Sequence, residues 1–547
     1  MLDGFVPFPP EFAARYRELG YWQGRTLAQE FAPVFERYAN DLALVDGSRR
    51  YTYRDIDRLS DNLALNLLDL GLKPLDRVVP VLPNVAEFVV LYFALQKLGC
   101  IPIAALVSHR YREVSQFVAL SGATTCIYPE VHGKFRFSAM MERVADESST
   151  LRFRIVLGTP LVGEASLVDL IERPAKRDPA ELRRLQLDAS DPCIFQLSGG
   201  TTGIPKLIPR THNDYAYNSK VAADVAMVAR SSVLLLVLPI AHNLPLACPG
   251  LQGFMLHGAR VVLHANTRSE EIFALIEQQR VTHLKVVPAL LIRLVNDASA
   301  KNFDLSSVLQ IQSGGQRMQP ETRHLAREVF CNAFIQENFG MSEGLLMFVR
   351  QGDPEEVLLE TCGRPVCADD EVKLIDEDGK EVADGEVGEL SCRGPYTLRG
   401  YYGVPEYNAR QFTPDGFYRS GDLMRKHPSG NYIVEGRKKD LINRGGEKIS
   451  AEEVENLILM HPAVANVACV PMPDPTLGER MCACVILRAG ERLSLEALVE
   501  FLMAQEIAKF KLPERIEVFQ EFPLSTFGKV SKKDLRNQIS ATLAKQA

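Results

Sequence analysis

Residues 197–206 read Leu-Ser-Gly-Gly-Thr-Thr-Gly-Ile-Pro-Lys, and the rest of the chain is organised around them. The glycines let backbone N–H groups approach an anion closely, the hydroxyls add neutral donors, and Lys206 adds a mobile positive charge. The spacing differs from a Walker A motif, because Ile204 and Pro205 separate the lysine from the last glycine and Leu207 follows it. We predict a loop that holds phosphate groups; the alternative is a Gly/Ser/Thr surface turn.

Apolar residues next to this loop predict the sheet that carries it. Residues 193–195, Cys-Ile-Phe, read as a strand, so the loop leaves the edge of a sheet, where open α/β sheets bind ligands. Strand and helix patterns alternate on both sides of the loop. Strand patterns occur at 50–53, 77–82, 233–239, 259–263, 284–287 and before a Gly-rich turn at 313–316, and an apolar helical stripe covers 86–98. This alternation predicts an α/β fold.

Length and composition set further limits. The chain has 547 residues, 46% of them hydrophobic, so more than one domain with a sizeable core is expected. A net charge of −7 argues against a general nucleic-acid binder. The N-terminus lacks a signal-peptide pattern, and no apolar stretch reaches the length of a membrane span. The 11 cysteines contain no CxxC pair, and we expect reduced, mostly buried thiols in a cytoplasmic protein.

Two polar side chains stand at places where sites are often built. His242 follows the buried strand pattern at 233–239, although a satisfied structural histidine is an alternative. Glu343 lies in a glycine-bounded turn that we predict for 336–344. A carboxylate near a phosphate loop suits Mg²⁺, which takes one or two carboxylates plus phosphate oxygens. The alternative is a solvated glutamate.

Three later segments complete the set of candidates. Asp422, in the stretch 418–423, offers a carboxylate suited to ribose hydroxyls, or it is a routine turn aspartate. Residues 436–448 are as polar and glycine-bearing as a linker, and a new α/β pattern follows, so we place a domain boundary there. Lys529 lies on a glycine turn, where a solvated surface lysine is the alternative.

Taken together, these segments resemble the core motifs of the adenylate-forming superfamily, which includes acyl-CoA synthetases, peptide-synthetase adenylation domains and luciferases. The resemblance implies an α/β fold whose large N-terminal domain, residues 1–438, has two sheet-and-helix subdomains plus a small β-barrel-like one. A small, mobile α+β C-terminal domain, residues 439–547, would carry Lys529. Such enzymes join a carboxylate to AMP with loss of pyrophosphate, then rotate the C-terminal domain and pass the acyl group to a thiol. The matching segments, in chain order, are 198–206, 338–343, 418–422, 436–446 and the Lys529 turn.

The resemblance also implies a role for each motif residue, with ATP and Mg²⁺ bound. Attack of a carboxylate on the α-phosphate brings two anions together, so positive charge and positioning matter more than a general base. Lys529 would bridge the two anions, with His242 and Glu343 as further catalytic candidates and Glu343 as the metal ligand. Lys439 would be the hinge. Gly445 and Gly446 would let a pantetheine arm pass close to the backbone. The residues expected to bind ATP are Ser198, Gly199, Gly200, Thr201, Thr202, Gly203, Lys206, Gly314, Gly315, Gln316, Asn338, Phe339, Gly340, Met341, Ser342, Asp422 and Arg437.

Within the superfamily, the chain resembles the aryl-acid activating enzymes of siderophore pathways. Those enzymes load salicylate or 2,3-dihydroxybenzoate onto an aryl carrier protein or domain with a phosphopantetheine arm. The resemblance rests on residues 207–212, Leu-Ile-Pro-Arg-Thr-His, residues 241–246, Ala-His-Asn-Leu-Pro-Leu, and residues 443–448, Asn-Arg-Gly-Gly-Glu-Lys. It implies a monomer or weak dimer that takes salicylate or a related acid as substrate.

Three pocket positions bear on the choice of acid, and two of them, Cys248 and Leu346, favour salicylate over 2,3-dihydroxybenzoate. The resemblance implies that Asn243 hydrogen-bonds the ortho hydroxyl of the acid, and a site built for that bond rejects plain benzoate. Cys248 stands where dihydroxybenzoate enzymes typically carry serine, and a thiol is a weak partner for a 3-hydroxyl. Leu346 fills space where a smaller valine is typical, which also points to salicylate. Among these enzymes, the chain most resembles the branch that serves pyochelin biosynthesis. The acid would also contact His242, Gly315 and Gly340.

Several alternatives stay open. The differences at Cys248 and Leu346 could be neutral drift, which leaves 2,3-dihydroxybenzoate as the acid. An aryl-CoA ligase would use the same fold and deliver the acyl group to CoA. A nucleotide-binding protein without turnover is the candidate from another class, but it would have little need for Lys529.

Overall fold

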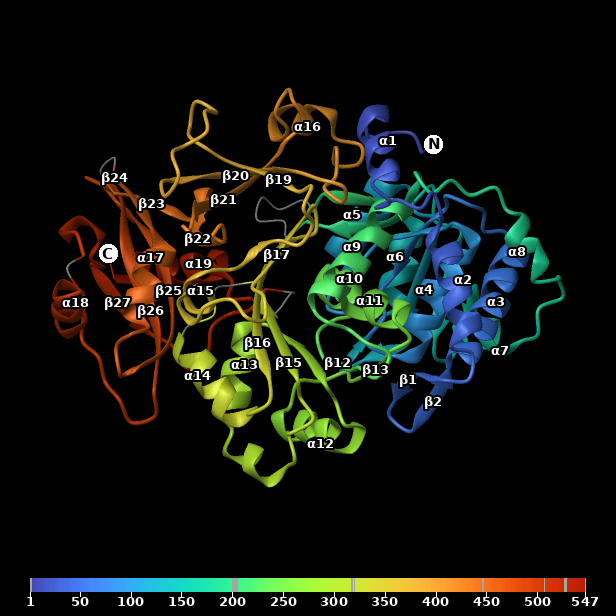
Figure 1. The fold of residues 1–547 in the computed structure, drawn as a ribbon, viewed down its shortest axis with the longest axis horizontal. Coiled ribbons are helices and arrows are strands. Elements are labelled where there is room, and N and C mark those ends of the chain that lie inside the picture. Colours follow the sequence, from blue (N-terminus) through green and yellow to red (C-terminus); the bar gives the residue numbers. More distant parts are fainter. Residues whose placement is uncertain are drawn as a thin grey trace.

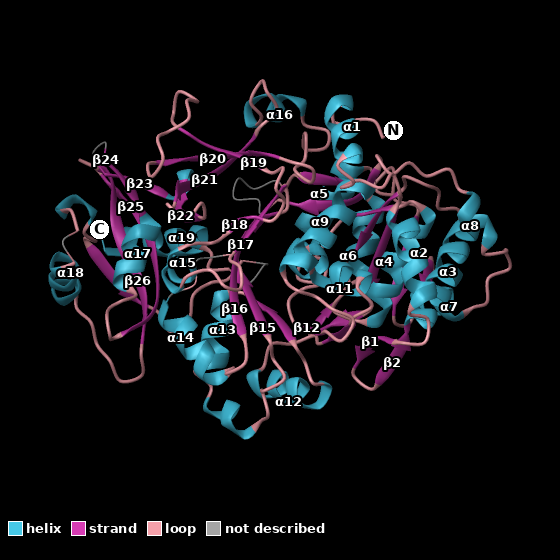
Figure 2. Cartoon of the chain, viewed as in Figure 1, coloured by secondary structure: helices cyan, strands magenta, loops and turns pink. Residues whose placement is uncertain are grey.

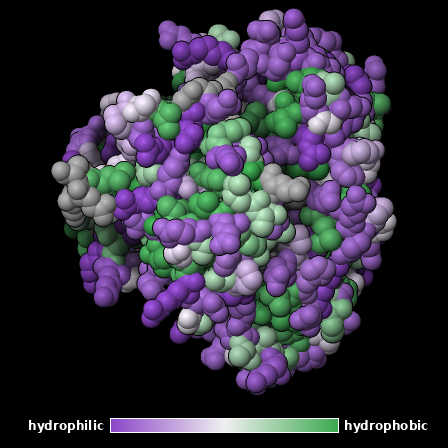
Figure 3. Space-filling view, turned by 90° about the vertical axis from the view of Figure 1, so that its left-hand side faces the viewer, coloured by the Kyte–Doolittle hydropathy of each residue, from purple (hydrophilic) through white to green (hydrophobic). Residues whose placement is uncertain are grey.

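The computed structural model describes residues 2–198, 205–315, 318, 320–444, 447–505, 507–525 and 529–546. Within these ranges the chain forms a large N-terminal part and a smaller C-terminal part at one end of the long axis (Figure 1). No helix in the described ranges is long and apolar enough to cross a membrane. The face that includes the C-terminal part is mainly hydrophilic, with hydrophobic residues showing between the polar ones (Figure 3).

The largest sheet has nine strands in the order β18-β17-β16-β15-β14-β12-β13-β1-β2. The central strands from β1 to β16 run parallel, and β2, β17 and β18 add antiparallel edges. Short apolar runs such as Val-Leu-Leu-Leu in β12 suit a parallel sheet that is covered on both faces. The strands are β1 (Leu42–Asp46), β2 (Arg49–Thr52), β12 (Val233–Leu236), β13 (Arg260–Leu263), β14 (His283–Val286), β15 (Gln310–Gly314), β16 (Phe334–Met341), β17 (Gly344–Phe348) and β18 (Arg364–Pro365).

A second sheet is wholly parallel, in the order β4-β3-β5-β8-β9. Its strands are β3 (Arg77–Pro80), β4 (Ile101–Pro102), β5 (Thr125–Pro129), β8 (Phe153–Leu157) and β9 (Glu164–Ser166). Short strands β6 (Val131–His132) and β7 (Phe135–Arg136) form a separate hairpin. The two sheet-and-helix subdomains expected from the sequence are therefore present.

Successive residues of β5 and of β12 face different cores, on opposite sides of their sheets. Figure 2 shows the helices in cyan and the strands in magenta. Leu234 and Ile127 share the core between the two sheets, Leu235 faces the outer core of the first sheet, and Cys126 faces that of the second. The middle layer contains α2 (Leu27–Arg37), α3 (Tyr53–Leu70), α4 (Ala86–Leu98), α9 (His212–Val225), α10 (Asn243–Ala247) and α11 (Gly250–Leu256). The outer layers are α12 (Ser269–Gln279), α13 (Pro288–Val295) and α14 (Pro320–Val329) on the first sheet, and α5 (Tyr111–Ser121) and α6 (Ser138–Asp146) on the second. The remaining helices of this part are α1 (Pro10–Glu18), α7 (Leu167–Glu172), α8 (Ala180–Arg184), α15 (Glu355–Glu360) and α16 (Pro405–Gln411).

The glycine loop joins two strands of an antiparallel hairpin. β10 (Pro192–Leu197) pairs with β11 (Leu207–Thr211), with Leu197 opposite Leu207. A bridge between Ile103 and Phe195 attaches the hairpin to the second sheet. The predicted strand at 193–195 is confirmed. Gly199, Gly200, Thr201, Thr202 and Gly203 lie outside the described residues, so their expected phosphate contacts stay a prediction.

A small antiparallel sheet follows, with strands β19 (Glu371–Ile375), β20 (Val387–Arg393), β21 (Tyr418–Lys426) and β22 (Tyr432–Arg437) in sequence order. The turn predicted for 336–344 is shorter than expected: residues 336–341 belong to β16, and the turn is confined to Ser342 and Glu343, just before β17. Of the two interpretations of Asp422, the routine turn aspartate is wrong, because 418–423 lies within β21. Pairing with β17 and β20 keeps both stretches extended despite their glycines.

The C-terminal part is a five-stranded sheet with helices on both faces. Val467 and Cys469 face α17 (Ala451–Ile458) and α18 (Leu495–Ala504), whereas Cys482 and Cys484 face α19 (Lys532–Gln546). Cys482 and Cys484 therefore share one strand face. The strands are β23 (Leu441–Arg444), β24 (Glu447–Ser450), β25 (Val464–Asp474), β26 (Gly478–Leu487) and β27 (Arg515–Val518).

The stretch 436–448 is structured. Residues 438–440 form a single 3-10 turn between β22 and β23, and β23 pairs with β24. A linker is therefore the wrong description for the described part of this stretch. The 3-10 turn is nevertheless the place where the chain passes from the small sheet of the N-terminal part into the C-terminal sheet.

Candidate active site

A cavity of about 1610 Å³ lies where the two parts of the chain meet. Pockets for a single small ligand usually have about 300–1000 Å³, so this one has room for a larger ligand or for two. Most of the predicted site residues line it: Ser198, His242, Asn243, Cys248, Gly314, Gly315, Asn338, Phe339, Gly340, Met341, Ser342, Glu343, Leu346, Asp422, Arg437, Lys439 and Lys529. Gln316, Gly445 and Gly446 lie outside the described residues.

The base of the glycine loop is closed by two hydrogen bonds. The Ser198 N–H donates to the Lys206 carbonyl at 3.1 Å, and the Lys206 N–H donates to Ser198 Oγ at 2.9 Å. Lys206 Nζ lies over the ring of Tyr407, 4.1 Å from its centroid, and burial lowers the lysine pKa while Glu343 opposes that shift. The loop lysine and the Glu343 carboxylate therefore lie close enough to interact.

Asp422 and Arg437 face each other across β21 and β22. They are cross-strand partners, and Arg437 Nε lies 2.8 Å from Asp422 Oδ1. Only 4% of Asp422 is exposed, and its carboxylate raises the pKa of Arg437. The pair presents a fixed carboxylate beside a fixed cation, the arrangement predicted for ribose hydroxyls and a phosphate.

Glu343 occupies the tight connection between β16 and β17. The Tyr401 hydroxyl donates to Glu343 Oε1 at 2.8 Å, and the Tyr401 and Tyr418 hydroxyls lie 2.9 Å apart. Burial raises the pKa of Glu343. Gly344 allows the turn, because its φ is +146° and an added Cβ would lie 2.5 Å from the Thr397 backbone. A half-buried carboxylate that gains from positive charge fits a divalent cation such as Mg²⁺.

Lys529 reaches the cavity from the C-terminal part. Its turn is held by a hydrogen bond of 3.2 Å from the Lys529 N–H to Ser525 Oγ. The side chain passes over Gly315, where an added Cβ would lie 2.7 Å from Lys529 Cε and where φ is +97°. Burial lowers the Lys529 pKa to about 8, with a further contribution from the Arg437 cation. The C-terminal part is thus docked with its predicted catalytic lysine inside the cavity.

The expected aryl-acid positions gather at the other side of the cavity. His242 caps α10 by accepting the Leu244 N–H at Nδ1, 3.3 Å away, and burial lowers its pKa to about 3, so the imidazole is neutral. Asn243 Nδ2 lies 3.3 Å from Cys248 Sγ. Gly340 makes space for the pocket wall, because an added Cβ would lie 2.7 Å from Leu346 Cδ2. The glycine and the leucine are cross-strand partners.

Sequence reasoning missed several buried residues behind these walls. Arg210 pairs with Asp214 at 2.7 Å and donates to the Ser342 carbonyl at 3.1 Å, so it braces the turn that carries Glu343. Lys285 Nζ donates to the Cys248 carbonyl at 2.6 Å. Arg210 belongs to the segment 207–212, which carries the family resemblance, so the sequence offered a hint of its importance. Lys285 is a single lysine in an apolar strand pattern, and nothing in the sequence marks it as important.

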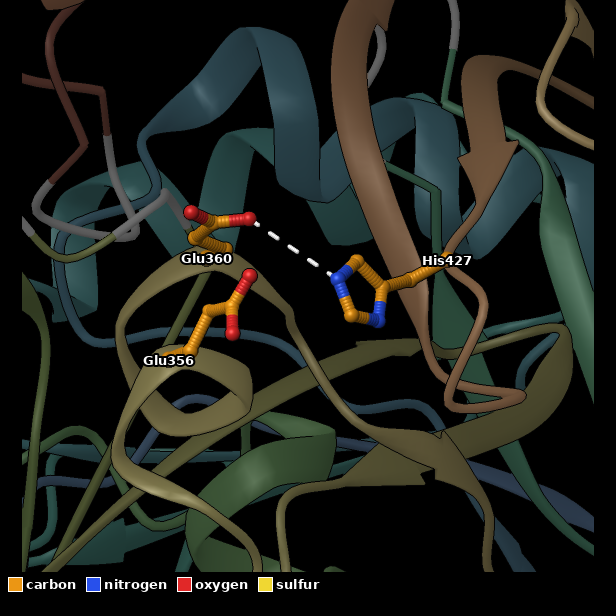
Figure 4. A group of neighbouring side chains, drawn as sticks. All are labelled: Glu356, Glu360 and His427. Carbon is orange, nitrogen blue, oxygen red and sulfur yellow. Dashed lines mark ion pairs between the residues drawn. The ribbon is translucent and has the colours of Figure 1, made fainter.

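A cluster of metal-ligating side chains lies apart from this cavity (Figure 4). Glu356 and Glu360 are one helical turn apart on α15, and His427 approaches them from the β21–β22 connection, with ligand atoms within 4.8 Å of one another. His427 Nε2 lies 3.8 Å from Glu360 Oε2, and both glutamates are exposed. A surface ion pair accounts for this arrangement, and we assign it no role.

Comparison with known sequences gives relatives over the full length. The chain is 45% identical over 542 residues to a salicylyl-CoA synthase / salicylate adenylyltransferase of Streptomyces, covering 98% of each chain. It is 42% identical to the 2,3-dihydroxybenzoate-AMP ligase of Bacillus subtilis, covering 99% of each. It is also 42% identical to pyochelin synthase PchD of Pseudomonas aeruginosa, covering 100% of this chain and 98% of that one. The expected similarity to aryl-acid activating enzymes is confirmed.

Comparison with solved structures confirms the fold. The apo structure of Mycobacterium smegmatis MbtA matches with a TM-score of 0.75 and 37% identity, covering 98% of this chain and 99% of that one. Family models described as AMP-binding enzyme and AMP-binding enzyme C-terminal domain match residues 31–402 and 453–529. With Lys529 inside the second match and the glycine loop and Glu343 inside the first, the chain belongs to the AMP-binding enzyme family.

Proposed function

We propose that this chain activates salicylate with ATP, releases pyrophosphate, and transfers the salicyl group to the phosphopantetheine thiol of an aryl carrier protein in siderophore biosynthesis. The observation that carries the proposal is the meeting of Lys529, the Asp422–Arg437 pair and Asn243 around one cavity. Nucleotide-binding and acid-binding groups therefore open onto the same space. The relatives named for salicylate and for pyochelin support the choice of acid.

The cations of the cavity reduce the repulsion between the two anions that react. A carboxylate must approach a phosphate, and the repulsion between these anions falls when fixed positive charge lies between them. With a pKa of about 8, Lys529 keeps its proton at pH 7 in most molecules. Arg437 adds a second cation, held in place by Asp422. His242 is neutral, so it can orient the acid without adding charge.

Glu343 is the proposed ligand of Mg²⁺. When bound, the metal ion neutralises charge on the phosphate oxygens. The chain contributes the orientation of the carboxylate, since Tyr401 holds one oxygen of Glu343 and Gly344 allows the tight turn. Lys206 and Ser198, at the base of the glycine loop, would hold the outer phosphates.

The pocket argues for salicylate over 2,3-dihydroxybenzoate. Cys248 is 2% exposed and its Sγ already accepts from Asn243, so it has little to offer a 3-hydroxyl. Leu346 fills the adjacent space, as the contact with Gly340 shows. A relative named for 2,3-dihydroxybenzoate has the same identity as one named for pyochelin, so the dihydroxy acid is the second candidate.

Transfer to the thiol is the second half of the proposal. We place the domain boundary at 438/439 and the hinge at Lys439, because the chain passes there from the small sheet into the C-terminal sheet through one 3-10 turn. Gly445 and Gly446 are proposed to line the pantetheine path. A relative named for CoA makes CoA an alternative acceptor, and comparing CoA with a loaded carrier domain would separate the two.

The experiment that tests the activity is acid-dependent exchange of labelled pyrophosphate into ATP. Salicylate, 2,3-dihydroxybenzoate, benzoate and several amino acids are compared on one preparation. We expect a clear preference for salicylate. Preference for 2,3-dihydroxybenzoate would keep the mechanism and overturn the argument from Cys248 and Leu346. Absence of exchange with every acid would overturn the proposed activity.

A further inference from the structure

The side-chain amide of Asn243 is fixed by a buried relay behind the cavity. Gln196 Nε2 donates to the Tyr215 hydroxyl at 3.0 Å, and this hydroxyl donates to Asn243 Oδ1 at 2.8 Å. The other end of the amide, Nδ2, lies 3.3 Å from Cys248 Sγ. Asn243 and Cys248 line the cavity, whereas Tyr215 is 0% exposed and Gln196 is 2% exposed. The oxygen of Asn243 is therefore engaged on the buried side, and its nitrogen lies on the side of the cavity-lining thiol.

The direction of the relay follows from the number of protons available. A tyrosine hydroxyl has one proton, and it accepts here from Gln196, so its own proton is left for Asn243. Burial raises the pKa of Tyr215 well above its ordinary value, which keeps that proton in place. The ring is held as well, because the Arg210 guanidinium lies over it, 4.8 Å from the centroid. Rotation of the Asn243 amide would set its N–H groups against the tyrosine proton, which costs a buried hydrogen bond.

We infer that Gln196 and Tyr215 are positioning residues that make Asn243 present a hydrogen-bond donor to the aryl acid, so that the site selects acids whose ortho group is an acceptor. The inference rests on the proposed activity and adds the chemical class of the ortho group. In salicylate, the phenolic proton bonds internally to the carboxylate, and the phenolic oxygen can accept from Asn243. In anthranilate, the ortho amine also bonds internally but keeps an outward N–H. This N–H and the Asn243 N–H are both donors, so they repel each other and form no hydrogen bond.

The first test is the order of three acids in pyrophosphate exchange on the unaltered enzyme. We expect salicylate to exceed benzoate by at least about tenfold in kcat/KM, because benzoate forfeits one hydrogen bond and leaves the Asn243 donor unpaired. Anthranilate should be no better than benzoate, because its ortho amine presents a hydrogen-bond donor where the site requires an acceptor. Anthranilate clearly above benzoate would show that Asn243 presents its oxygen, and would overturn the inference while leaving the proposed activity in place. No exchange with any acid would overturn both.

The second test removes the tyrosine hydroxyl. Tyr215→Phe keeps the ring under Arg210 and frees the Asn243 amide to rotate, so the ratio of kcat/KM for salicylate to that for anthranilate should fall several-fold. Tyr217→Phe is the matched control. It lies on the same helix, and its hydroxyl contacts Cys367 Sγ at 3.1 Å, so its removal should leave the ratio unchanged.

The readout separates positioning from general damage. Loss of packing would raise KM for all acids together and leave their ratio constant. A constant ratio in Tyr215→Phe, with wild-type KM for ATP, would overturn the role of the relay. A fall in the ratio that Tyr217→Phe shares equally would also overturn it.

Discussion

Two buried cations support the walls of the cavity, and they are balanced in different ways. Arg210 has the Asp214 carboxylate at 2.7 Å, and it also donates to the carbonyls of Ser342 and Tyr396. Lys285 instead contacts the Cys248 carbonyl and the side-chain oxygen of Gln312. Neutral acceptors offset less of the cost of burying a charge than a carboxylate does. Lys285 is therefore the more pH-sensitive of the two.

Replacing Lys285 with Met tests how the buried lysine changes the pH dependence of the free energy of unfolding. Burial lowers the Lys285 pKa from 10.5 to about 7. Between these two values the unfolded chain binds more protons than the folded chain, so stability rises with pH across this window. The Met variant lacks this contribution. As the pH is raised from 7 to 9.5, the unfolding temperature of the wild type should therefore rise relative to that of the variant. Thermal unfolding of both proteins at several pH values gives the difference, and a constant difference would contradict the assignment.

Lys529→Ala tests the cation that reaches the reacting groups. Removing a comparable electrostatic donor costs roughly a hundred- to a thousandfold in rate, so pyrophosphate exchange should fall by that factor. Transfer from supplied salicyl-AMP to the carrier should change little, because the phosphate repulsion has already been overcome. Lys509→Ala, which removes an exposed lysine of the C-terminal part that is not among the cavity-lining residues, is the control and should leave both rates near wild type. Equal loss of both half-reactions in Lys529→Ala would contradict the role.

The candidate site residues could be selected from the sequence where a motif carries them. Asp422, Glu343 and Lys529 were all expected at one site, and all line one cavity, whereas their chemical roles stay predictions. Lys285 and Tyr215 could not be predicted. Their importance depends on which oxygen or amide each one meets inside the fold, and those partners are 19 to 37 residues away in the chain.

At the scale of elements, strand pairing decides more than local propensity. The central strands were predicted to within a few residues, because apolar runs are local signals. Residues 336–341 were included in a predicted turn because their glycine is a local signal too, whereas the pairing that keeps them extended is not local. That pairing sets Gly340 opposite Leu346, two residues of the proposed aryl-acid pocket.

The 3-10 turn of residues 438–440 is the element that the second half-reaction is expected to use. Lys439→Pro fixes φ at the proposed hinge, so adenylation should stay largely intact while transfer to the carrier falls by roughly tenfold or more. Lys439→Ala removes the same side chain and keeps the backbone free, so it should retain transfer. Single-turnover measurement of each half-reaction checks the two variants. A Pro variant that loses both half-reactions equally would count against a hinge at this position.

At the scale of the whole molecule, the docking of the C-terminal part assembles the adenylation site. The Lys529 side chain passes over Gly315 into the cavity, and it brings its charge to the vicinity of Arg437 and Lys439. A two-domain chain could be predicted from the sequence. The docked arrangement could not, because it depends on surfaces from residues more than 200 positions apart.

This docking predicts different pH profiles for the two half-reactions. Adenylation needs protonated Lys529, and its pKa of about 8 in the docked state means that kcat/KM for exchange should fall as pH rises through about 8. Transfer from supplied salicyl-AMP should lack this fall, because the proposed rotation removes Lys529 from the cavity. The cation of Lys439 contributes to lowering the Lys529 pKa, so Lys439→Met should move the descending limb of the exchange profile to higher pH. Exchange that stays constant to pH 9.5, or a limb that moves to lower pH in Lys439→Met, would contradict Lys529 as the titrating group.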